Sequence, residues 1–255
     1  MNDASSPAAV SRPQAAATAL PLRAEHVSLT RGGRTLIGDV TLTVGAAPGV
    51  TVLMGPNGAG KSLMARILAN LVAPDSGRVL WAGHPPDRER QRAIGFVFQK
   101  PVLLDRPALA NVAFAIEAAG FAKREAQDRA HAALAMGGLS HLAAQPARTL
   151  SGGEQQRLAL SRALACEPQI VILDEPCANL DPSSAAAIET QIRNASDSGT
   201  AILLISHDLA QARRLGRRLI VLHEGKVLEE GDAADVLAHP RTRAGAQFIK
   251  GELID

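Results

Sequence analysis

The fold of this 255-residue chain is decided by the stretch Gly55-Pro56-Asn57-Gly58-Ala59-Gly60-Lys61-Ser62. It fits the phosphate-binding pattern of a glycine, four residues, then glycine, lysine, and serine or threonine. The apolar, β-branched run 50–54 before it predicts a buried strand, and residues 63–71 after it keep apolar residues at helical spacing. The pattern alone would equally describe a flexible turn, but a strand before it and a helix after it are the context in which it binds phosphate.

The residue types of this loop indicate how it would hold a nucleoside triphosphate. Gly55, Gly58 and Gly60 allow backbone conformations closed to other residues, so that successive N–H groups can converge on phosphate oxygens. The helix that starts near Lys61 adds the positive end of its dipole. Lys61 supplies a positive charge to the β- and γ-phosphates, and the Ser62 hydroxyl can bind Mg²⁺.

The composition, 46% hydrophobic and 20% charged, is typical of a soluble globular protein. A net charge of +2 is too small to indicate a nucleic-acid partner, and none is expected. No window approaches the roughly 18 uninterrupted apolar residues of a membrane span. Cys166 and Cys177 lack metal-ligand spacing, so we expect reduced thiols in an intracellular protein.

The chain divides by composition. Residues 1–20 are rich in Ala, Ser and Pro and lack the features of a secretory signal, so we expect a disordered tail before a single domain over 21–255. Strands at 22–29 and 35–44 predict an N-terminal antiparallel β part. From about 100 to 166 helix formers dominate, which predicts an inserted helical subdomain.

Strand patterns alternate with helical stretches over the rest of the chain. The predicted strands are 50–54, 94–98, 170–173, 201–205 and 219–223. This alternation predicts an α/β fold in which a mainly parallel sheet is flanked by helices on both faces. The polar, proline-bearing segment 83–92 is expected to be a loop. The basic cluster within residues 213–218 is interpreted as a solvated helix end.

The strand at 170–173 ends in two carboxylates, Asp174 and Glu175. In such a sheet the ends of the strands line the ligand crevice. Asp174 is therefore placed to hold Mg²⁺, directly or through water, and Glu175 is the natural general base for an attacking water. The alternative is an acidic helix cap, which the phosphate loop upstream disfavours.

The stretch Leu150-Ser151-Gly152-Gly153-Glu154-Gln155-Gln156 predicts the start of another helix. Ser151 and Glu154 have the spacing of a capping box. The two glycines expose N–H groups at the positive end of that helix, which makes a second anion-binding surface. By itself this would only be a well-capped helix, but one chain with two phosphate-seeking helix starts needs another explanation.

With these motifs in this order, the sequence resembles the ATP-binding subunit of an ABC transporter. Residues 150–156 match the signature motif of that family, and Gln99, Asp174-Glu175, Ala178-Asn179-Leu180-Asp181 and His207 follow its order. The resemblance covers about residues 22–240. It implies a P-loop ATPase that uses ATP and Mg²⁺ and couples hydrolysis to transport.

The resemblance assigns roles to residues of this chain. The nucleotide-binding residues would be Arg31 and Gly55, Pro56, Asn57, Gly58, Ala59, Gly60, Lys61 and Ser62. The catalytic residues would be Glu175, His207 and Gln99. The Mg²⁺ site would be formed by Ser62, Gln99 and Asp174. His207 would contact the γ-phosphate and hold Glu175 and water in line, rather than only cap a helix. In the family two copies meet head to tail around two ATP molecules. The residues that would reach the nucleotide of the other copy are Ser151, Gly152, Gly153, Gln155 and Asp181.

One position departs from the family. An aromatic residue near position 31 usually stacks on adenine, but residues 28–33 contain none and Arg31 occupies that place. A guanidinium plane can stack on a base with less apolar area than Tyr. We expect weaker contact with adenine and looser base selectivity.

Residues 98–104, 207–215 and 248–253 resemble bacterial importers of oxyanions of the tungstate type, with phosphate or polar amino-acid importers as the alternative. The resemblance implies integral membrane permease subunits, one of which docks a coupling helix on the helical subdomain. It also implies a periplasmic or extracellular substrate-binding protein that acts indirectly, and a location at the cytoplasmic face of the membrane. A soluble ABC ATPase of Fe–S assembly stays open, whereas a P-loop kinase or GTPase does not need the motif at 151–156.

Overall fold

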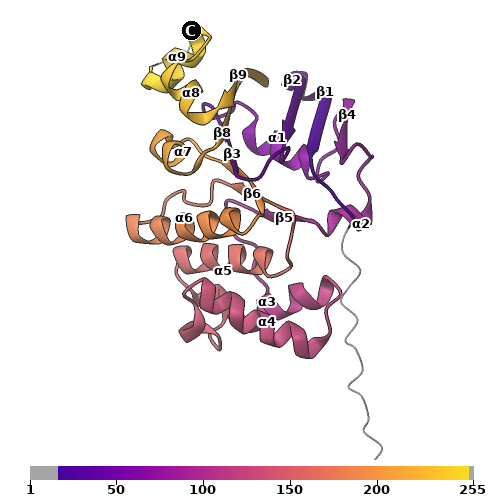
Figure 1. Cartoon of the computed structure of the whole chain (residues 1–255), viewed down its shortest axis with the longest axis vertical. Helices are drawn as coiled ribbons and strands as arrows, with labels where there is room; N and C mark the ends of the chain where they lie inside the picture. Colours follow the sequence, from indigo (N-terminus) through magenta and orange to yellow (C-terminus); the bar gives the residue numbers. More distant parts are fainter. Residues whose placement is uncertain (1–16, 253–255) are drawn as a thin grey trace, which may run out of the picture.

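The computed structural model describes residues 17–252, with the strands gathered in one half of the molecule, where further helices flank them, and the other half formed by helices (Figure 1). Residues 1–16 of the predicted tail lie outside the described part. Ala19, which the sequence also places in the tail, is fully buried, and its backbone N–H donates to Gln169 Oε1 at 2.9 Å. The packed chain therefore includes residues before the predicted boundary at residue 21.

The predicted N-terminal β part is an antiparallel sheet. Strand β1 (Leu22–Arg31) lies between β2 (Arg34–Val44) and β4 (Ser76–Trp81), and it is antiparallel to both. Its residues alternate between buried and exposed along β1, as expected for a sheet with one face on the core. The N-terminal hairpin predicted from the sequence is confirmed.

A six-stranded sheet forms the centre of the molecule in the order β5-β6-β7-β3-β8-β9. Its strands are β3 (Val50–Met54), β5 (Ile94–Val97), β6 (Ile170–Asp174), β7 (Ala201–Ile205), β8 (Arg218–His223) and β9 (Lys226–Asp232). All adjacent pairs are parallel except β8 and β9. The inner strands β3, β6 and β7 are buried along their whole length and almost entirely apolar because both faces of the sheet are covered.

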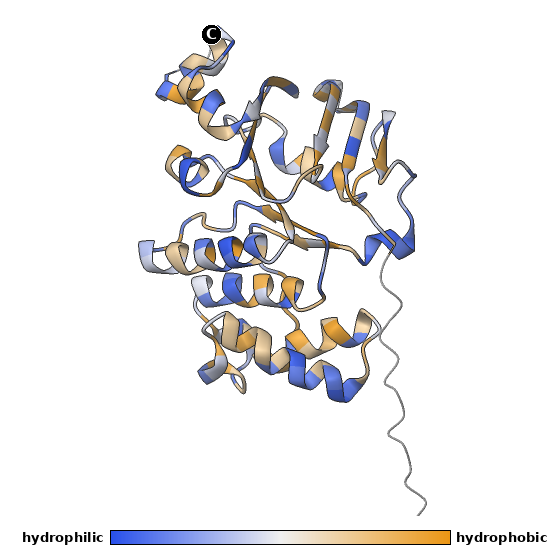
Figure 2. Cartoon of the chain, in the orientation of Figure 1, coloured by the Kyte–Doolittle hydropathy of each residue, from blue (hydrophilic) through white to orange (hydrophobic). Residues whose placement is uncertain are grey.

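Alternate residues of each central strand enter two different cores. On β6, Ile170 and Ile172 pack toward the antiparallel sheet and helix α1 (Lys61–Leu68), whereas Val171 and Leu173 pack toward the other helices. This follows from the two-residue period of a strand. In Figure 2 the central strands are accordingly among the most apolar parts of the ribbon.

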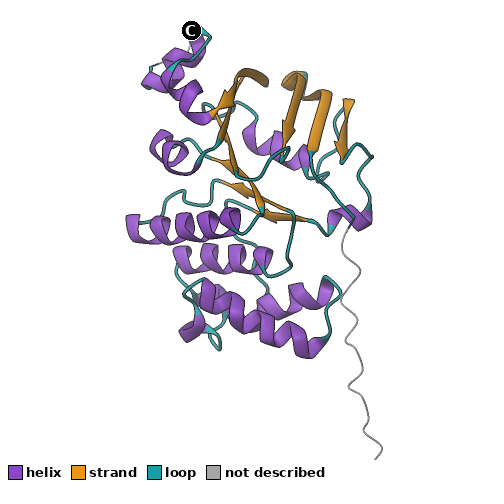
Figure 3. Ribbon diagram, in the orientation of Figure 1, coloured by secondary structure: helices purple, strands orange, loops and turns teal. Residues whose placement is uncertain are grey.

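The predicted helical subdomain is confirmed, and it occupies the end of the molecule away from the antiparallel sheet (Figure 3). Its helices are α3 (Ala108–Ala118), α4 (Lys123–Met136) and α5 (Gly152–Leu164), with 3₁₀ turns at Ser140–Leu142 and Ala147–Thr149. On α4 the buried residues Ala126, Ala130, Ala133 and Leu134 form one helical stripe. The remaining helices are α6 (Pro182–Asp197), α7 (Leu209–Leu215), α8 (Ala233–Ala238) and α9 (Arg243–Lys250). Over residues 17–252, none of the helices has the length and apolar character to cross a membrane.

The predicted loop at 83–92 is wrong in its second half, because residues Arg88–Gln91 form the short helix α2. Asp87 caps this helix by accepting a hydrogen bond from the Arg90 backbone N–H at 2.8 Å. The signal was present in the sequence as an Asp followed by helix-forming Arg, Glu and Gln residues. The two prolines before it masked that signal.

The strand order decides where the functional segments meet. Strands β5, β6, β7 and β3 are consecutive neighbours and run in one direction, so the segments that follow them leave the same edge of the sheet. Those segments carry Gln99, Asp174-Glu175, His207 and the phosphate loop. Residues far apart in the sequence therefore converge at the crevice where parallel α/β sheets bind ligands.

Candidate functional site

The phosphate loop connects β3 to α1 and needs its glycines. The φ angles of Gly55, Gly58 and Gly60 are 145°, 80° and 99°, all in the region that favours glycine. At Gly55 a Cβ atom would also lie 1.9 Å from the carbonyl oxygen of Leu222 at the end of β8. On its other side the loop is held by the Gly225 N–H, which donates to the Ala59 carbonyl at 3.0 Å.

Lys61 is folded back over this loop. Its Nζ donates to the carbonyl oxygens of Gly55 at 2.8 Å and of Pro56 at 3.0 Å, and the residue is only 6% exposed. Burial lowers the pKa of Lys61, while the nearby carboxylates of Glu175 and Asp174 act in the opposite direction. The ammonium group is thus already placed inside the curve of the loop that would surround phosphates.

Ser62 and Asp174 bring two hard oxygen ligands together. The Ser62 hydroxyl donates to Asp174 Oδ1 at 2.6 Å, and Asp174 is only 2% exposed. A hydroxyl and a buried carboxylate in contact fit Mg²⁺, which prefers oxygen ligands and keeps several waters. Among the described residues, the side-chain hydrogen bond of Gln99 goes to Glu175 rather than to Ser62 or Asp174.

Glu175 has a backbone conformation that is rare for its type. Its φ is 47°, in the left-handed region, and its N–H donates to the Ile205 carbonyl on β7 at 3.1 Å. One carboxylate oxygen lies 3.5 Å from His207 Nδ1, and the other accepts from Gln99 Nε2 at 3.4 Å. Strained backbone of this kind concentrates at functional sites, and here it directs the carboxylate between Gln99 and His207.

The residues expected to act on the other copy form a separate cluster. Ser151 begins α5 in a complete capping box, and its N–H and hydroxyl donate to Glu154 Oε2 at 2.8 and 2.7 Å. These hydrogen bonds hold the pKa of the Glu154 carboxyl below its usual value. Gly153 packs so closely on Ser184 of α6 that a Cβ atom would lie 2.4 Å from the Ser184 hydroxyl.

Asp181 belongs to the same cluster. It caps α6 by accepting from the backbone N–H groups of Ser183 and Ser184, each at 3.0 Å. Hydrogen bonds from these two serines hold the pKa of Asp181 well below its usual range, so the side chain is ionised at neutral pH. Within residues 17–252, the side-chain hydrogen bonds of Ser151 and Asp181 involve Glu154, Ser183 and Ser184, and none involves the phosphate loop.

Arg31 is held at the tip of the β1–β2 hairpin. Its Nη1 donates to Asp75 Oδ1 at 2.8 Å and to the Thr30 carbonyl at 2.7 Å, and Asp75 Oδ2 also accepts from the Thr30 N–H. The hairpin is tied to the phosphate loop through Gly225, whose carbonyl accepts from the Gly38 N–H at 2.9 Å. The partner Asp75 was not anticipated from the sequence.

Comparison with known proteins identifies the family of the chain. A family model described as ABC transporter matches residues 37–178. The phosphate import ATP-binding protein PstB 2 of Natronomonas pharaonis is 36% identical over 238 residues, which cover 87% of this chain and 84% of that protein. This chain belongs to the ABC transporter family. It is an ATP-binding protein and an ATPase of that family.

Other relatives place the chain in the same family. The Fe(3+) ions import ATP-binding protein FbpC 1 of Rhizobium meliloti is 37% identical over 225 residues, and the chain spans 63% of that protein's length. The solved structure of cbiO1 from Clostridium perfringens, part of the ABC transporter complex cbiONQ, has a TM-score of 0.75 and 28% identity. The similarity to cbiO1 covers 86% of this chain and 90% of that one. The cbiO1 structure shares the predicted architecture, which confirms the fold class.

One residue beside the Ser62–Asp174 pair was not anticipated from the sequence. Arg66 Nη2 lies 3.7 Å from Asp174 Oδ2. Helical spacing could have revealed it, because Ser62 and Arg66 are four residues apart on α1 and share a face. Arg66 thus places a positive charge near the Asp174 oxygen that does not accept from Ser62.

Proposed function

We propose that this chain hydrolyses ATP with Glu175 as general base and His207 and Gln99 as its neighbours in the site. The observation that carries this is the convergence of Lys61, Ser62, Asp174 and Glu175 at one sheet edge. Lys61 and the N–H groups of the loop bind the phosphates. Mg²⁺, held by Ser62 and Asp174, would neutralise the charge that develops on the β- and γ-phosphates.

Glu175 takes a proton from the attacking water while the water oxygen forms a bond to the γ-phosphorus. The bond between the γ-phosphorus and the bridging oxygen of ADP breaks, and ADP leaves. His207, 3.5 Å from the carboxylate, contacts the γ-phosphate and keeps the water in line. Gln99 contacts the other carboxylate oxygen and connects this step to the helical subdomain that follows it in the chain. The residues Ser151, Gly152, Gly153, Gln155 and Asp181 complete the site of a second, head-to-tail copy.

The separation of the two clusters within one chain supports this dimer. Ser151 and its glycines present a helix N-terminus with an anion-binding character, yet their hydrogen bonds within residues 17–252 do not reach Lys61. A second copy, rotated so that each signature faces the other's phosphate loop, uses both surfaces at once. Two-fold symmetry then gives two equivalent sites.

The proposed cargo is an oxyanion taken into the cell, and phosphate is favoured over tungstate. The relative that the chain covers to 84% of its length is named for phosphate import. None of the relatives named above supports tungstate. Fe(3+) import is a second candidate, since the FbpC relative is equally similar, although the chain spans less of its length.

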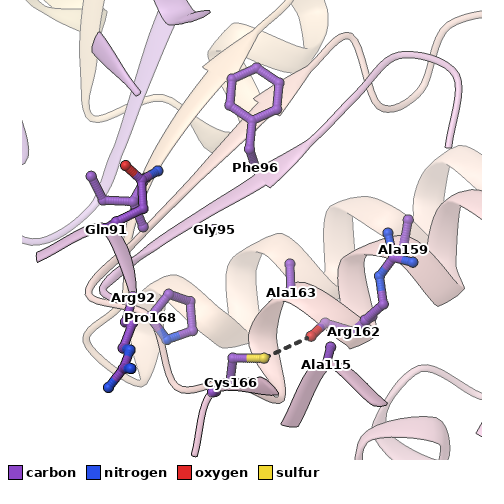
Figure 4. Close-up of a pocket in the computed structure, with 12 residues that line it drawn as sticks. Gln91, Arg92, Gly95, Phe96, Ala115, Ala159, Arg162, Ala163, Cys166 and Pro168 are labelled. Atoms are coloured by element: carbon purple, nitrogen blue, oxygen red, sulfur yellow. Dashed lines mark hydrogen bonds between the residues drawn. The ribbon is translucent and has the colours of Figure 1, made fainter. Parts of the chain in front are cut away.

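The proposed membrane partner docks where the helical subdomain meets the sheet. A pocket of about 240 Å³ opens between the edge strand β5 and helices α3 and α5 (Figure 4). It is lined by Gly95 and Phe96 on one side and by Ala115, Arg162 and Cys166 on the other. This junction suits a coupling helix of a permease, which would hold the chain at the cytoplasmic face of the membrane.

Uptake measurements test this function. Cells lacking the chain are expected to lose uptake of radioactive phosphate and to keep that of Fe³⁺ and tungstate, and the tagged chain is expected to co-purify with an integral membrane subunit. If only the uptake of tungstate or of Fe³⁺ is lost, that ion and not phosphate is the cargo. Co-purification with soluble Fe–S assembly proteins instead would contradict a role in transport.

Replacement of Arg31 by Tyr is expected to lower the KM for ATP several-fold and to raise the preference for ATP over GTP. A Tyr ring offers adenine more apolar area than a guanidinium that is already paired with Asp75. Steady-state phosphate release with each nucleotide measures both effects. The exposed replacement Arg124→Tyr serves as the control, and an unchanged KM and an unchanged ATP/GTP preference in Arg31→Tyr would exclude Arg31 from the base site.

A further inference from the structure

Glu189 of α6 is a buried carboxylate that the proposed catalytic steps do not use. It is 7% exposed, and it accepts two hydrogen bonds from Arg214 of α7, from Nε at 2.9 Å and from Nη2 at 2.6 Å. These bonds hold the pKa of Glu189 below its usual value, against the effect of burial. Arg214 belongs to the basic cluster that is interpreted from the sequence as a solvated helix end: its side chain is 48% exposed, and its guanidinium also reaches Glu189 of α6.

The Glu189 carboxylate is linked to both loops that carry the catalytic pair. Gln211 Nε2 donates to Glu189 Oε1 at 3.2 Å, and the Gln211 side chain also hydrogen-bonds the Cys177 thiol, two residues after Glu175. Arg214 Nη2 lies 3.9 Å from Asp208 Oδ2, and Asp208 follows His207 directly. Through Gln211 and Arg214, one buried carboxylate is thus linked to neighbours of both Glu175 and His207.

The position of His207 depends on its backbone neighbours. The side chain is 60% exposed, and its ion-pair contact is with Glu175 at 3.5 Å. Before it, the Ser206 N–H donates to the Leu53 carbonyl at 3.2 Å. After it, the Asp208 N–H donates to the Ser206 hydroxyl at 3.0 Å, and the Asp208 carboxylate caps α7 by accepting from the Ala210 N–H at 2.7 Å. Movement of α7 would therefore move His207.

We propose that Glu189, Gln211 and Arg214 are positioning residues that hold the His207 loop and the Glu175 loop at a fixed separation. The bidentate pair fixes the orientation of α7 on α6 more tightly than a single contact would. Asp181 is the N-cap of α6, so the same pair connects the expected dimer seam to the His207 loop. This inference rests on the proposed roles of Glu175 and His207.

The variants Glu189→Gln and Arg214→Lys test it in the full chain. Each is expected to lower the kcat for ATP about tenfold, because small displacements of catalytic groups have effects of this order. The KM for ATP is expected to stay within about twofold, because the phosphate loop is untouched. The NMR signals of the His207 ring are expected to shift in both variants. Glu125→Gln, which removes the Glu125–Arg129 pair of α4, is the control and should change neither the kcat nor the ring signals.

A second variant distinguishes the positioning role from a purely structural role. Glu189→Gln/Arg214→Gln removes both charges, which costs less stability than leaving one buried charge alone, so this variant is expected to stay folded. Its kcat is still expected to fall. Wild-type kcat and unshifted His207 signals, with only a lower melting temperature, would overturn the positioning role. Wild-type protein that does not hydrolyse ATP would instead overturn the proposed function.

Discussion

Replacement of Glu175 by glutamine is expected to stop ATP turnover while ATP still binds. The amide keeps the size of the side chain and can still contact Gln99 and His207, but it cannot take the proton of the attacking water. Loss of a general base costs about 10²–10⁴-fold in rate, so kcat should fall by that factor. Lys61 and its loop are unaffected, and the unhydrolysed ATP should hold two copies together as a stable dimer.

Phosphate release measures the rate, nucleotide fluorescence measures binding, and gel filtration with ATP measures the dimer. Glu117→Gln, an exposed carboxylate on α3, is the matched control and should behave as wild type. A Glu175→Gln protein that hydrolyses ATP at the wild-type rate would remove Glu175 from the mechanism. One that no longer binds ATP would show that Glu175 supports binding rather than proton transfer.

Most of this site could be read from local sequence because local physics determines it. The strand before the loop is a continuous apolar run, and the glycines at 55, 58 and 60 are required by positive φ angles. Ser151 and Glu154 form their capping box within one helical turn. Asp181 caps α6 by accepting from the N–H groups two and three residues after it. Each of these signals lies within a few residues of the structure that it predicts.

The features that sequence reasoning missed depend on packing between distant segments. Arg214 looks like part of an exposed basic run, and only the approach of α6 brings Glu189 within reach of it. Arg31 finds Asp75 because β1 and β4 are adjacent in the antiparallel sheet. No periodicity encodes these pairings, since the two partners belong to elements whose contact is set by the whole fold.

The same reasoning sharpens the meaning of the two clusters. Gly153 lies against Ser184, and the Ser184 N–H donates to Asp181, so the signature and the expected seam residue are connected within one chain. Lys61, Ser62 and Asp174 are connected within the other cluster. If the two clusters act together only across two copies, a variant with a defective phosphate loop should be complemented by a variant with a defective signature motif.

This repair is the second large effect that we expect. Lys61→Ala should lose ATP binding, because it removes the buried ammonium group from the phosphate loop. Ser151→Asp/Glu154→Gln should bind ATP but not turn it over. This variant keeps an Asp N-cap and a Gln at the third position, so α5 stays capped, while a carboxylate now faces the partner's γ-phosphate. Glu154→Gln alone is its control and should retain turnover.

A heterodimer purified through two different tags, one on each variant, should recover turnover that neither homodimer shows. One of its two sites pairs the intact loop of the Ser151 variant with the intact signature of the Lys61 variant, so the rate should approach about half that of wild type. In the matched control heterodimer, the subunit with Lys61→Ala is replaced by a subunit with Lys123→Ala, an exposed position on α4. Both phosphate loops of this control are intact. A heterodimer as inactive as its parents would mean that Ser151 acts within its own chain, because only contact across the seam places the intact loop and the intact signature in one site.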